Sequence, residues 1–531
     1  MLMIKKCKDP MALDPMYGFS IMEKSLRLFI CVVVGAFVVP GDTVKPALLL
    51  TPYIAQNRLQ EARNLSRVDP KLFLNVDSHS GFLTVDKRYN SNLFFWYFPI
   101  ASRVAEDTPW IIWLQGGPGA TSLVGVFDEM GPFEQPFGFK LRETSWCNDY
   151  SMLFIDNPVG AGFSFTDHKN GLPRDVETYT NHLFSALRQF LTIFPELQKA
   201  PLYIAGSSYA GRYLPALGER ISATNSNINL QGLIFGNPVF NRESIMDYST
   251  VFYQWGLIDQ QGVLAVKPVQ DKYKEAITSG QSEVAAFIRE ELLDKLQELS
   301  SQYELYNILK DDHKALSKFI AVVTDETVRE ALHVGDLGFT LSNASVHRSL
   351  APDFLQKVSP KIEALLERYR ILIYCGQLDL IAPCVQNAEA RRRSWHWSGR
   401  QQFLEAPRVP WWSHGSVAGY VKSGGNLTEA LVRGAGHIAP MDKPAEIQEL
   451  VNYFIQELEV PTPPGFRTES VPEYGELQWG DESSHAGLIV SVVMNVLLIF
   501  SIIAMVLWFL TWKRKSDAVF IPLTEDIFNV A

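Results

Sequence analysis

Apolar residues recur every three or four positions between residues 175 and 194, a spacing that predicts a helix with one apolar face. Asp175 is a suitable N-cap for this helix, and Pro195 marks its end. Shorter apolar runs predict strands at residues 89–99, 109–114, 152–155, 202–205, 370–377 and 427–432. Strands that alternate with helices predict an α/β fold with a mostly parallel central sheet and helices on both faces.

Residues 240–325 differ from the rest because they contain long polar helical patterns, such as 283–302, and no clear strand. We expect a helical insertion that forms a cap over the functional edge of the sheet; a peripheral helical decoration is the alternative. The main domain is then expected to cover residues 42–460, with an extended arm at 42–70.

The N-terminal segment has the pattern of a targeting sequence. An apolar run at 28–39 follows Lys24 and Arg27, as in a signal peptide. We therefore expect residues 1–41 to be an N-terminal extension plus signal peptide, with an uncleaved signal anchor as the alternative.

The C-terminal region predicts a membrane anchor. Residues 461–485, rich in proline and acidic residues, predict a stalk, and the uncharged run 486–512 is long enough to cross a bilayer. Lys513, Arg514 and Lys515 follow it, so residues 513–531 are expected to be a cytoplasmic tail. This predicts a single-pass type I protein of the secretory or endolysosomal system or the plasma membrane, with its main domain lumenal or extracellular.

The composition limits which partners and cofactors are expected. The net charge of −10 comes without a basic stripe, which argues against a nucleic-acid partner. No cluster of His, Cys and carboxylates has metal-ligand spacing, so neither a metal nor another cofactor is expected.

The main domain contains three cysteines, Cys147, Cys375 and Cys384. The simplest outcome is one disulfide and one free thiol, and the sequence leaves the pairing open. Three buried, inert thiols are the alternative.

Three Asn-x-Ser/Thr sequons lie in the main domain. A secretory signal makes them candidate glycosylation sites, at Asn64, Asn343 and Asn426.

The stretch Y-I-A-G-S-S-Y-A-G at 203–211 has the pattern of a nucleophile elbow, in which a strand turns sharply through a strained serine into a helix. Only small residues fit two positions before and after that serine. Gly206 and Ala210 flank Ser208 in this way, whereas Ser207 would have the bulky Tyr209. Ser208 is therefore the candidate nucleophile; an ordinary strand-turn-helix junction is the alternative.

Two later loops supply partners for Ser208. Asp379 follows the strand at 370–377, and His437 lies on a glycine-rich loop after the strand at 427–432. Loops at the carboxyl ends of strands carry the chemistry of α/β sheets, and the order Ser208, Asp379, His437 is that of α/β-hydrolases. Taken singly, Asp379 could be a helix cap and His437 a core histidine.

Several motifs in register resemble the serine carboxypeptidases, most closely their vitellogenic-like branch. They span about residues 60–458 and read W-L-Q-G-G-P-G-A-T-S-L at 113–123, F-I-D-N-P-V-G-A-G-F-S-F-T at 154–166, G-S-S-Y-A-G at 206–211, V-R-E-A-L-H-V at 328–334, Y-C-G-Q-L-D at 374–379, V-A-G-Y at 417–420 and R-G-A-G-H-I-A-P at 433–440. The resemblance implies an α/β-hydrolase fold and release of C-terminal residues from peptides or proteins through an acyl-enzyme.

A serine nucleophile needs an adjacent base, and that base needs a group that orients it. His437 would take the proton of Ser208, and Asp379 would orient His437. The oxyanion hole is expected from the N–H groups of Tyr209 and Gly117.

The site for the substrate's terminal carboxylate departs from the family. The resemblance assigns it to Gln115 with Gly116, where the family has an asparagine, to Ser207, where it has a glutamate, and to Glu129, whose family counterpart shares a proton with that glutamate. Two close carboxyl groups raise one pKa. Without its partner, Glu129 is expected to ionise at a lower pH or to bond to Ser207, with weaker terminal recognition and a different pH optimum.

This departure keeps two other functions open: a non-catalytic binding or protective protein, and an acyltransferase or esterase on the same scaffold. The sequence also leaves a homodimer open.

Overall fold

The computed structural model describes residues 45–134, 140–224, 226–240, 247–302, 304–310, 318–467 and 485–517. The predicted signal peptide, most of the predicted stalk and residues 518–531 lie outside these ranges. The chain divides into two units, residues 1–468 and 469–531, which are described separately.

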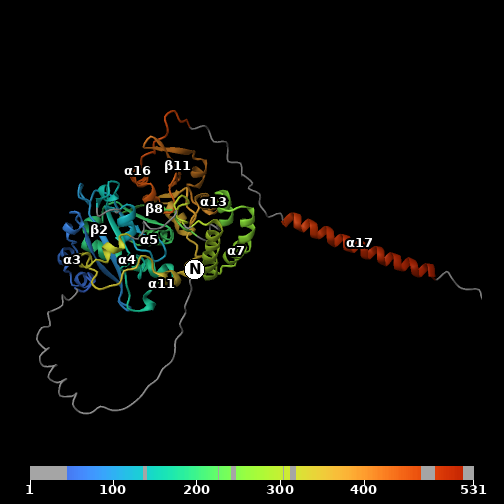
Figure 1. Cartoon of the computed structure of the whole chain (residues 1–531), viewed down its shortest axis with the longest axis horizontal. Helices are drawn as coiled ribbons and strands as arrows, with labels where there is room; N and C mark the ends of the chain where they lie inside the picture. Colours follow the sequence, from blue (N-terminus) through green and yellow to red (C-terminus); the bar gives the residue numbers. More distant parts are fainter. Residues whose placement is uncertain are drawn as a thin grey trace, which may run out of the picture. The chain divides into compact units, whose positions relative to one another are not determined.

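A ten-stranded sheet forms the centre of the first unit (Figure 1), in the order β1-β2-β6-β3-β7-β8-β9-β12-β11-β10. Its five central pairings, from β6-β3 to β9-β12, are parallel, and the pairings at both edges are antiparallel. The strands are β1 (His79–Asp86), β2 (Ser91–Phe98), β3 (Trp110–Leu114), β6 (Ser151–Ile155), β7 (Leu202–Ser207), β8 (Leu230–Gly236), β9 (Arg370–Gly376), β10 (Arg408–Ser413), β11 (Ser416–Gly424) and β12 (Leu427–Val432).

Alternate residues of the strands enter two separate cores because both faces of the sheet are covered. On one face Ile112 and Ile204 pack with α4 (Val176–Ile193), α5 (Ala210–Ala223) and α12 (Ser359–Leu366). On the other face Trp113 and Tyr203 pack with α16 (Pro444–Ile455). The predicted fold class, an α/β fold with helices on both faces of a mostly parallel sheet, is confirmed.

The predicted elements agree closely with the structure. Helix α4 begins after Asp175, whose carboxylate accepts a hydrogen bond of 2.7 Å from Thr178 N, and it ends two residues before Pro195. The predicted strands correspond to β2, β3, β6, β7, β9 and β12. The prediction of an extended arm was wrong in part, because α2 (Thr51–Ala55) and α3 (Leu59–Leu65) are helical.

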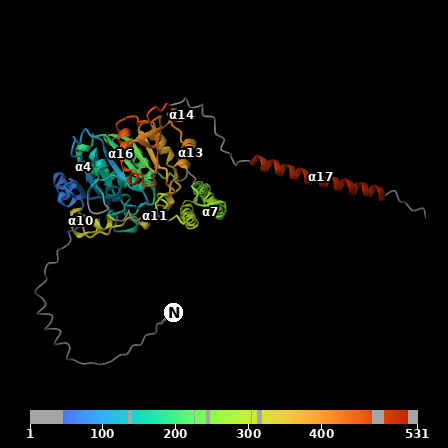
Figure 2. The same ribbon diagram turned by 45° about the horizontal axis from the view of Figure 1, so that its top comes forward.

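The segment from 247 to 323 contains helices and no strand in its described part. Its elements are α6 (Tyr248–Gln254), α7 (Gln260–Thr278), α8 (Ser282–Ser300) and α9 (Ile320–Val323). Helices α6 to α8 pack around a third core that includes Phe252, Leu292 and Leu380, the last from the loop after β9. Helix α7 lies at one side of the unit in both orientations (Figure 2).

In the second unit, α17 runs from His485 to Asp517. Within it, Met494–Lys513 has a mean hydropathy of 2.4 and no buried residue, and among the described residues only this helix is long and apolar enough to cross a membrane.

A buried ion pair lies beneath the loop that follows β7. Arg212 and Asp353 have side-chain exposures of 1% and 0%, and Arg212 Nε donates to Asp353 Oδ2 at 2.8 Å. Arg212 Nη2 also donates to the carbonyl oxygens of Asp353 and Gln356. The hydroxyl of Tyr209 donates to Asp353 Oδ2 at 2.9 Å, so the pair anchors the residue that follows Ser208.

This buried pair predicts a stability effect. Replacing Asp353→Asn keeps the size of the side chain but leaves the Arg212 charge uncompensated, and we expect a loss of about 3–5 kcal/mol in the free energy of unfolding. Urea unfolding of the purified chain measures it. Glu61→Gln, at an exposed ion pair with Arg58, is the control and should change stability by less than about 1 kcal/mol. An equally small effect of Asp353→Asn would contradict the prediction.

Candidate active site

Ser208 occupies a strained position between β7 and α5. Its φ of +57° lies in the left-handed region, whereas Ser207 is the last residue of the strand. Ser208 N donates to Gly236 O at 2.9 Å, and Ser208 O accepts from the N–H groups of Gly211 and Val239, each at 3.0 Å. Ser208 is half-buried while its neighbours Ser207 and Tyr209 are buried. The turn therefore holds one serine side chain at the surface of the site.

Close backbone approaches explain the small residues around this turn. A Cβ on Gly206 would lie 2.4 Å from Leu114 O and 2.7 Å from Ala210 Cβ. A Cβ on Gly116 would lie 2.6 Å from Ser208 Cβ and 2.7 Å from Tyr209 N. Glycine at 116 thus lets the loop after β3 pass directly against the serine and the Tyr209 amide.

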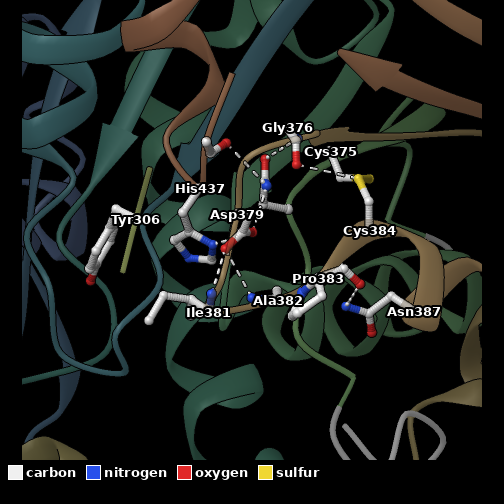
Figure 3. A network of polar contacts seen from close by, with 12 residues as sticks. Tyr306, Cys375, Gly376, Asp379, Ile381, Ala382, Pro383, Cys384, Asn387 and His437 are labelled. Carbon is white, nitrogen blue, oxygen red and sulfur yellow. Dashed lines mark hydrogen bonds and ion pairs between the residues drawn. A yellow bond between two sulfur atoms is a disulfide. The ribbon is translucent and has the colours of Figure 1, made fainter. Parts of the chain in front are cut away.

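Asp379 and His437 meet at the carboxyl ends of β9 and β12 (Figure 3). His437 Nδ1 lies 2.7 Å from Asp379 Oδ2, and the two side chains are 4% and 0% exposed. Asp379 Oδ1 accepts from the N–H groups of Ile381 at 2.7 Å and Ala382 at 3.0 Å. The carboxylate is thereby fixed by backbone donors on one oxygen and by the imidazole on the other.

Asn237, which was not predicted from the sequence, also binds this carboxylate. Its Nδ2 donates to Asp379 Oδ2 at 2.7 Å and to Gly436 O at 3.3 Å, and it is 1% exposed. Asn237 follows β8 directly and has a φ of +43°. Its place just after a strand, at the carboxyl edge that carries the other candidates, is the signal that could have identified it.

The glycine-rich loop after β3 is held by the buried Asp156. Asp156 Oδ1 accepts from Thr121 Oγ1 at 2.6 Å and Ser122 N at 2.8 Å, and Ser122 Oγ accepts from Gln115 N at 3.1 Å. Burial raises the pKa of Asp156 to about 6. Gly117 lies in this loop with a φ of +109°, and it is exposed. The amide of Gly117 is thus carried by a rigid loop beside the elbow.

Gln115 and Glu129 form a buried polar pair. Gln115 Nε2 donates to Glu129 Oε1 at 2.9 Å, and Gln115 Oε1 accepts from Trp113 Nε1 at 2.9 Å. These three side chains are at most 7% exposed. Among the described residues, no hydrogen-bond partner reaches Glu129 Oε2.

The carboxyl group of Glu129 has a raised pKa. Burial, with a smaller contribution from nearby Asp128, raises it to about 8, against the hydrogen bond from Gln115. Burial also raises the pKa of Asp128 to about 7. Loss of water is thus the largest influence on this carboxyl group. That Glu129 ionises at a lower pH than it would beside a carboxylate at position 207 stays a prediction. Gln115, rather than Ser207, is its recorded partner.

Ser207 lies beside Gly116, because a Cβ on Gly116 would lie 2.7 Å from Ser207 O. It is 6% exposed and pairs with Gly236 of β8, which in turn pairs with Tyr374 of β9. A Cβ on Gly236 would lie 2.5 Å from the Tyr374 hydroxyl. Ser207 and Tyr374 thus flank the same glycine at the carboxyl edge of the sheet.

One disulfide lies beside the loop of Asp379 (Figure 3). Cys375 and Cys384 form a disulfide with a Cα–Cα distance of 5.8 Å, and Cys147 is free, with its pKa raised to about 12 by burial. One bridge and one free thiol agree with the sequence prediction.

The three candidate glycosylation sites differ in exposure. Asn64 and Asn426 are exposed, and Asn343 is half-buried at the start of α11 (Ala344–Ser349). No group of His, Cys, Asp or Glu within the described ranges could hold a metal ion.

Comparisons with known proteins identify the family. The sequence model of the family described as serine carboxypeptidase matches residues 69–457. The chain is 38% identical over 443 residues to the protein called probable serine carboxypeptidase CPVL of Homo sapiens, covering 78% of this chain and 90% of that one. It is 37% identical over 433 residues to the vitellogenic carboxypeptidase of Aedes aegypti, covering 78% and 91%.

A solved structure supports the fold. Kex1Δp, a prohormone-processing carboxypeptidase from Saccharomyces cerevisiae, superposes with a TM-score of 0.67 at 24% identity, covering 76% of this chain and 98% of that one. Together with the family match and the close relatives, this α/β-hydrolase likeness means that the chain belongs to the serine carboxypeptidases, a family of hydrolases of the serine protease type.

Proposed function

We propose that this protein is a membrane-anchored serine carboxypeptidase that releases C-terminal residues from peptides with Ser208, His437 and Asp379. The observation that carries the proposal is the contact of 2.7 Å between His437 Nδ1 and Asp379 Oδ2, at the sheet edge where Ser208 has its strained φ of +57°. Asp379 is itself held by four donors, from Ile381, Ala382, Asn237 and His437.

The reaction uses these groups in two steps. With Nδ1–H donated to Asp379, Nε2 of His437 accepts the Ser208 hydroxyl proton as the serine attacks the last peptide carbonyl. The same proton then passes to the nitrogen of the departing amino acid, leaving an acyl-enzyme. Water, deprotonated by His437, hydrolyses the ester and restores Ser208.

The developing oxyanion would be bound by the N–H groups of Tyr209 and Gly117. Removing one such donor costs about 2.7–4 kcal/mol in comparable sites, so their placement matters. The buried Arg212–Asp353 pair holds the Tyr209 side chain, and Asp156 holds the loop of Gly117.

The terminal carboxylate of the substrate would be bound beside Gln115, Gly116 and Ser207, with Glu129 behind Gln115. A pKa of about 8 keeps Glu129 protonated at acid and neutral pH. A protonated Glu129 adds no negative charge to a site that must accept a carboxylate.

The proposed cellular arrangement follows from the ends of the chain. Residues 1–41 would be an extension plus signal peptide, 461–485 a stalk, 486–512 the membrane span and 513–531 a cytoplasmic tail. The apolar helix Met494–Lys513 supports the anchor. The domain of residues 42–460, with Asn64, Asn343 and Asn426 glycosylated, would then be lumenal or extracellular, in a secretory, endolysosomal or plasma membrane.

The main test is hydrolysis of N-blocked dipeptides by the chain and by Ser208→Ala. We expect release of the C-terminal residue by the parent and a fall of about 10⁴-fold or more in the variant, because the nucleophile is lost. A fluorophosphonate, which labels activated serines, measures the nucleophile without peptide recognition. Ser207→Ala is the matched control and should keep the label.

The other outcomes favour the alternative functions. Labelling without peptide hydrolysis would indicate that terminal recognition is lost, and esters, amides and acyl acceptors would then be the substrates to test. Failure of Ser208 to label in the folded protein would favour a non-catalytic binding or protective role.

The pH dependence of Glu129 predicts a change in KM. Below pH 8 Glu129 is neutral, and as the pH rises through about 8 it gains a charge that repels the substrate carboxylate. We expect KM for dipeptides to rise above this pH in the parent and to stay flatter in Glu129→Gln, with Glu61→Gln as the control. Equal KM profiles for all three proteins would contradict the assignment.

The raised pKa of Glu129 also predicts how the stability of the fold depends on pH. Because the folded pKa of Glu129, about 8, exceeds the ordinary 4.5, its favourable contribution is full below pH 4.5 and is lost as pH rises through 8. The fall in melting temperature between pH 5 and 8 should therefore be smaller in Glu129→Gln than in the parent or in Glu61→Gln.

Restoring the family residue tests the role of position 207. Ser207→Glu adds a carboxyl group that can share a proton with Glu129 and bond to the substrate carboxylate at acid pH. We expect KM to fall by about tenfold at acid pH, the value of one hydrogen bond to a charged group, and the activity optimum to move to lower pH. Unchanged kinetics and pH profile would refute a role of Ser207 in terminal recognition.

A further inference from the structure

The segment 304–308, between α8 and α9, contacts both loops of the proposed triad. Leu380 N donates to Leu305 O at 3.1 Å, and Ile308 N donates to Leu378 O at 3.2 Å, so the segment binds the chain on both sides of Asp379. His437 N donates to Tyr306 O at 2.5 Å. One stretch of the helical insertion thus supplies backbone partners to the acid loop and to the histidine itself.

The Tyr306 side chain lies against the imidazole. Its ring meets the His437 ring edge to face, with centroids 5.1 Å apart and an angle of 83° between the planes (Figure 3). Gly436, just before His437, has no room for a side chain, because a Cβ there would lie 2.0 Å from Tyr306 O. The Tyr306 backbone is fixed in turn by Glu304, a side chain 2% exposed, whose Oε1 accepts from Tyr306 N at 2.6 Å.

A second contact holds the loop of Asp379 from the other side. Arg289 of α8 donates through Nη2 to Ile381 O at 3.0 Å and through Nε to the Tyr248 hydroxyl at 2.8 Å. The Tyr248 hydroxyl donates to the same Ile381 carbonyl at 3.1 Å. Ile381 is the residue whose N–H binds Asp379 Oδ1 at 2.7 Å. Its carbonyl is held by the insertion, and its amide holds the carboxylate.

A third contact ties the insertion to the residue before His437. Asp442 Oδ2 accepts from Gly436 N at 2.7 Å and from Asn307 Nδ2 at 2.9 Å, while Lys310 pairs with Oδ1 of the same carboxylate. The Asp442 side chain is 4% exposed, so little water competes for these bonds. Both loops therefore have polar contacts with the insertion at residues adjacent to the proposed catalytic groups.

We propose that the helical insertion is a positioning device for the triad, with Arg289 acting on Asp379 through Ile381 and Tyr306 acting on His437. This inference rests on the proposed function of Ser208, His437 and Asp379. It differs from control of substrate access, since the contacts that carry it are with the loops of Asp379 and His437. Displacement of a catalytic group by about 1 Å can cost about 100-fold in rate, so a loop held by these bonds has a measurable effect.

Arg289→Met is the principal test, in the full chain. It removes both donors of Arg289 while keeping an apolar stem of similar length. We expect kcat for dipeptides and the rate of fluorophosphonate labelling of Ser208 to fall together, by about 10- to 100-fold, with KM within about twofold of the parent. Arg289→Lys, which keeps one charged donor, should recover part of the labelling rate. Lys267→Met, at an exposed position of α7, is the control.

A double-mutant cycle separates positioning from general destabilisation. If Arg289 acts through Asp379, Arg289→Met should lower the labelling rate by less than about twofold in an Asp379→Asn background. A full loss in that background would overturn the inference while leaving the triad intact. Unchanged labelling in Asp379→Asn alone would instead overturn the proposed triad, and the inference with it.

Milder variants keep the test decisive if Arg289→Met does not fold. Tyr248→Phe removes one of the two donors to Ile381 O, and Tyr306→Leu removes the ring from His437 while keeping the backbone acceptor. Each should slow labelling by a few-fold at temperatures well below its melting point. Parent-like labelling in both folded variants would overturn the inference.

Discussion

The backbone conformation of Ser208 is the constraint on which the rest of the site depends. A φ of +57° at a residue with a side chain is unfavourable, and it persists only because several surrounding bonds hold it. Gly236 O and the amides of Gly211 and Val239 fix the turn from one side, and the closely packed Gly116 fixes it from the other. The buried Arg212–Asp353 pair beneath Tyr209 completes this support. The strain is thus compensated by neighbouring residues of α5 together with parts of the chain far from Ser208 in sequence, such as Gly116, Gly236 and Asp353.

Burial determines the acid chemistry around the site. Glu129, Asp128 and Asp156 all lie where water is scarce, and each has a raised pKa. Because its pKa is higher in the folded state, each of these carboxyl groups contributes more to the stability of the fold at acid pH than at neutral pH.

The helical insertion is more closely joined to the site than a peripheral decoration would be. Its core includes Leu380 from the loop of Asp379, and its segment 304–308 bonds to both triad loops. In the proposed arrangement the expected cap would also be the scaffold of the triad, so a change in the insertion that altered specificity would also alter the geometry of the proposed base and acid. The two effects are separable by comparing KM with the labelling rate of Ser208.

The sequence by itself determined the alternation of strands and helices, the elbow at Ser208 and the order of the three candidate residues, because these depend on local periodicity and on short motifs. It did not reveal Asn237, Arg289 or Tyr306, whose neighbours along the chain carry no recognisable motif. It also did not indicate that burial raises the pKa of Glu129, since a pKa depends on how much water the fold removes. Only the tertiary structure decided these features. The hydrogen bonds between Asp379 and Asn237 and between Ile381 and Arg289 join residues 142 and 92 positions apart, and burial is a property of the whole packed domain.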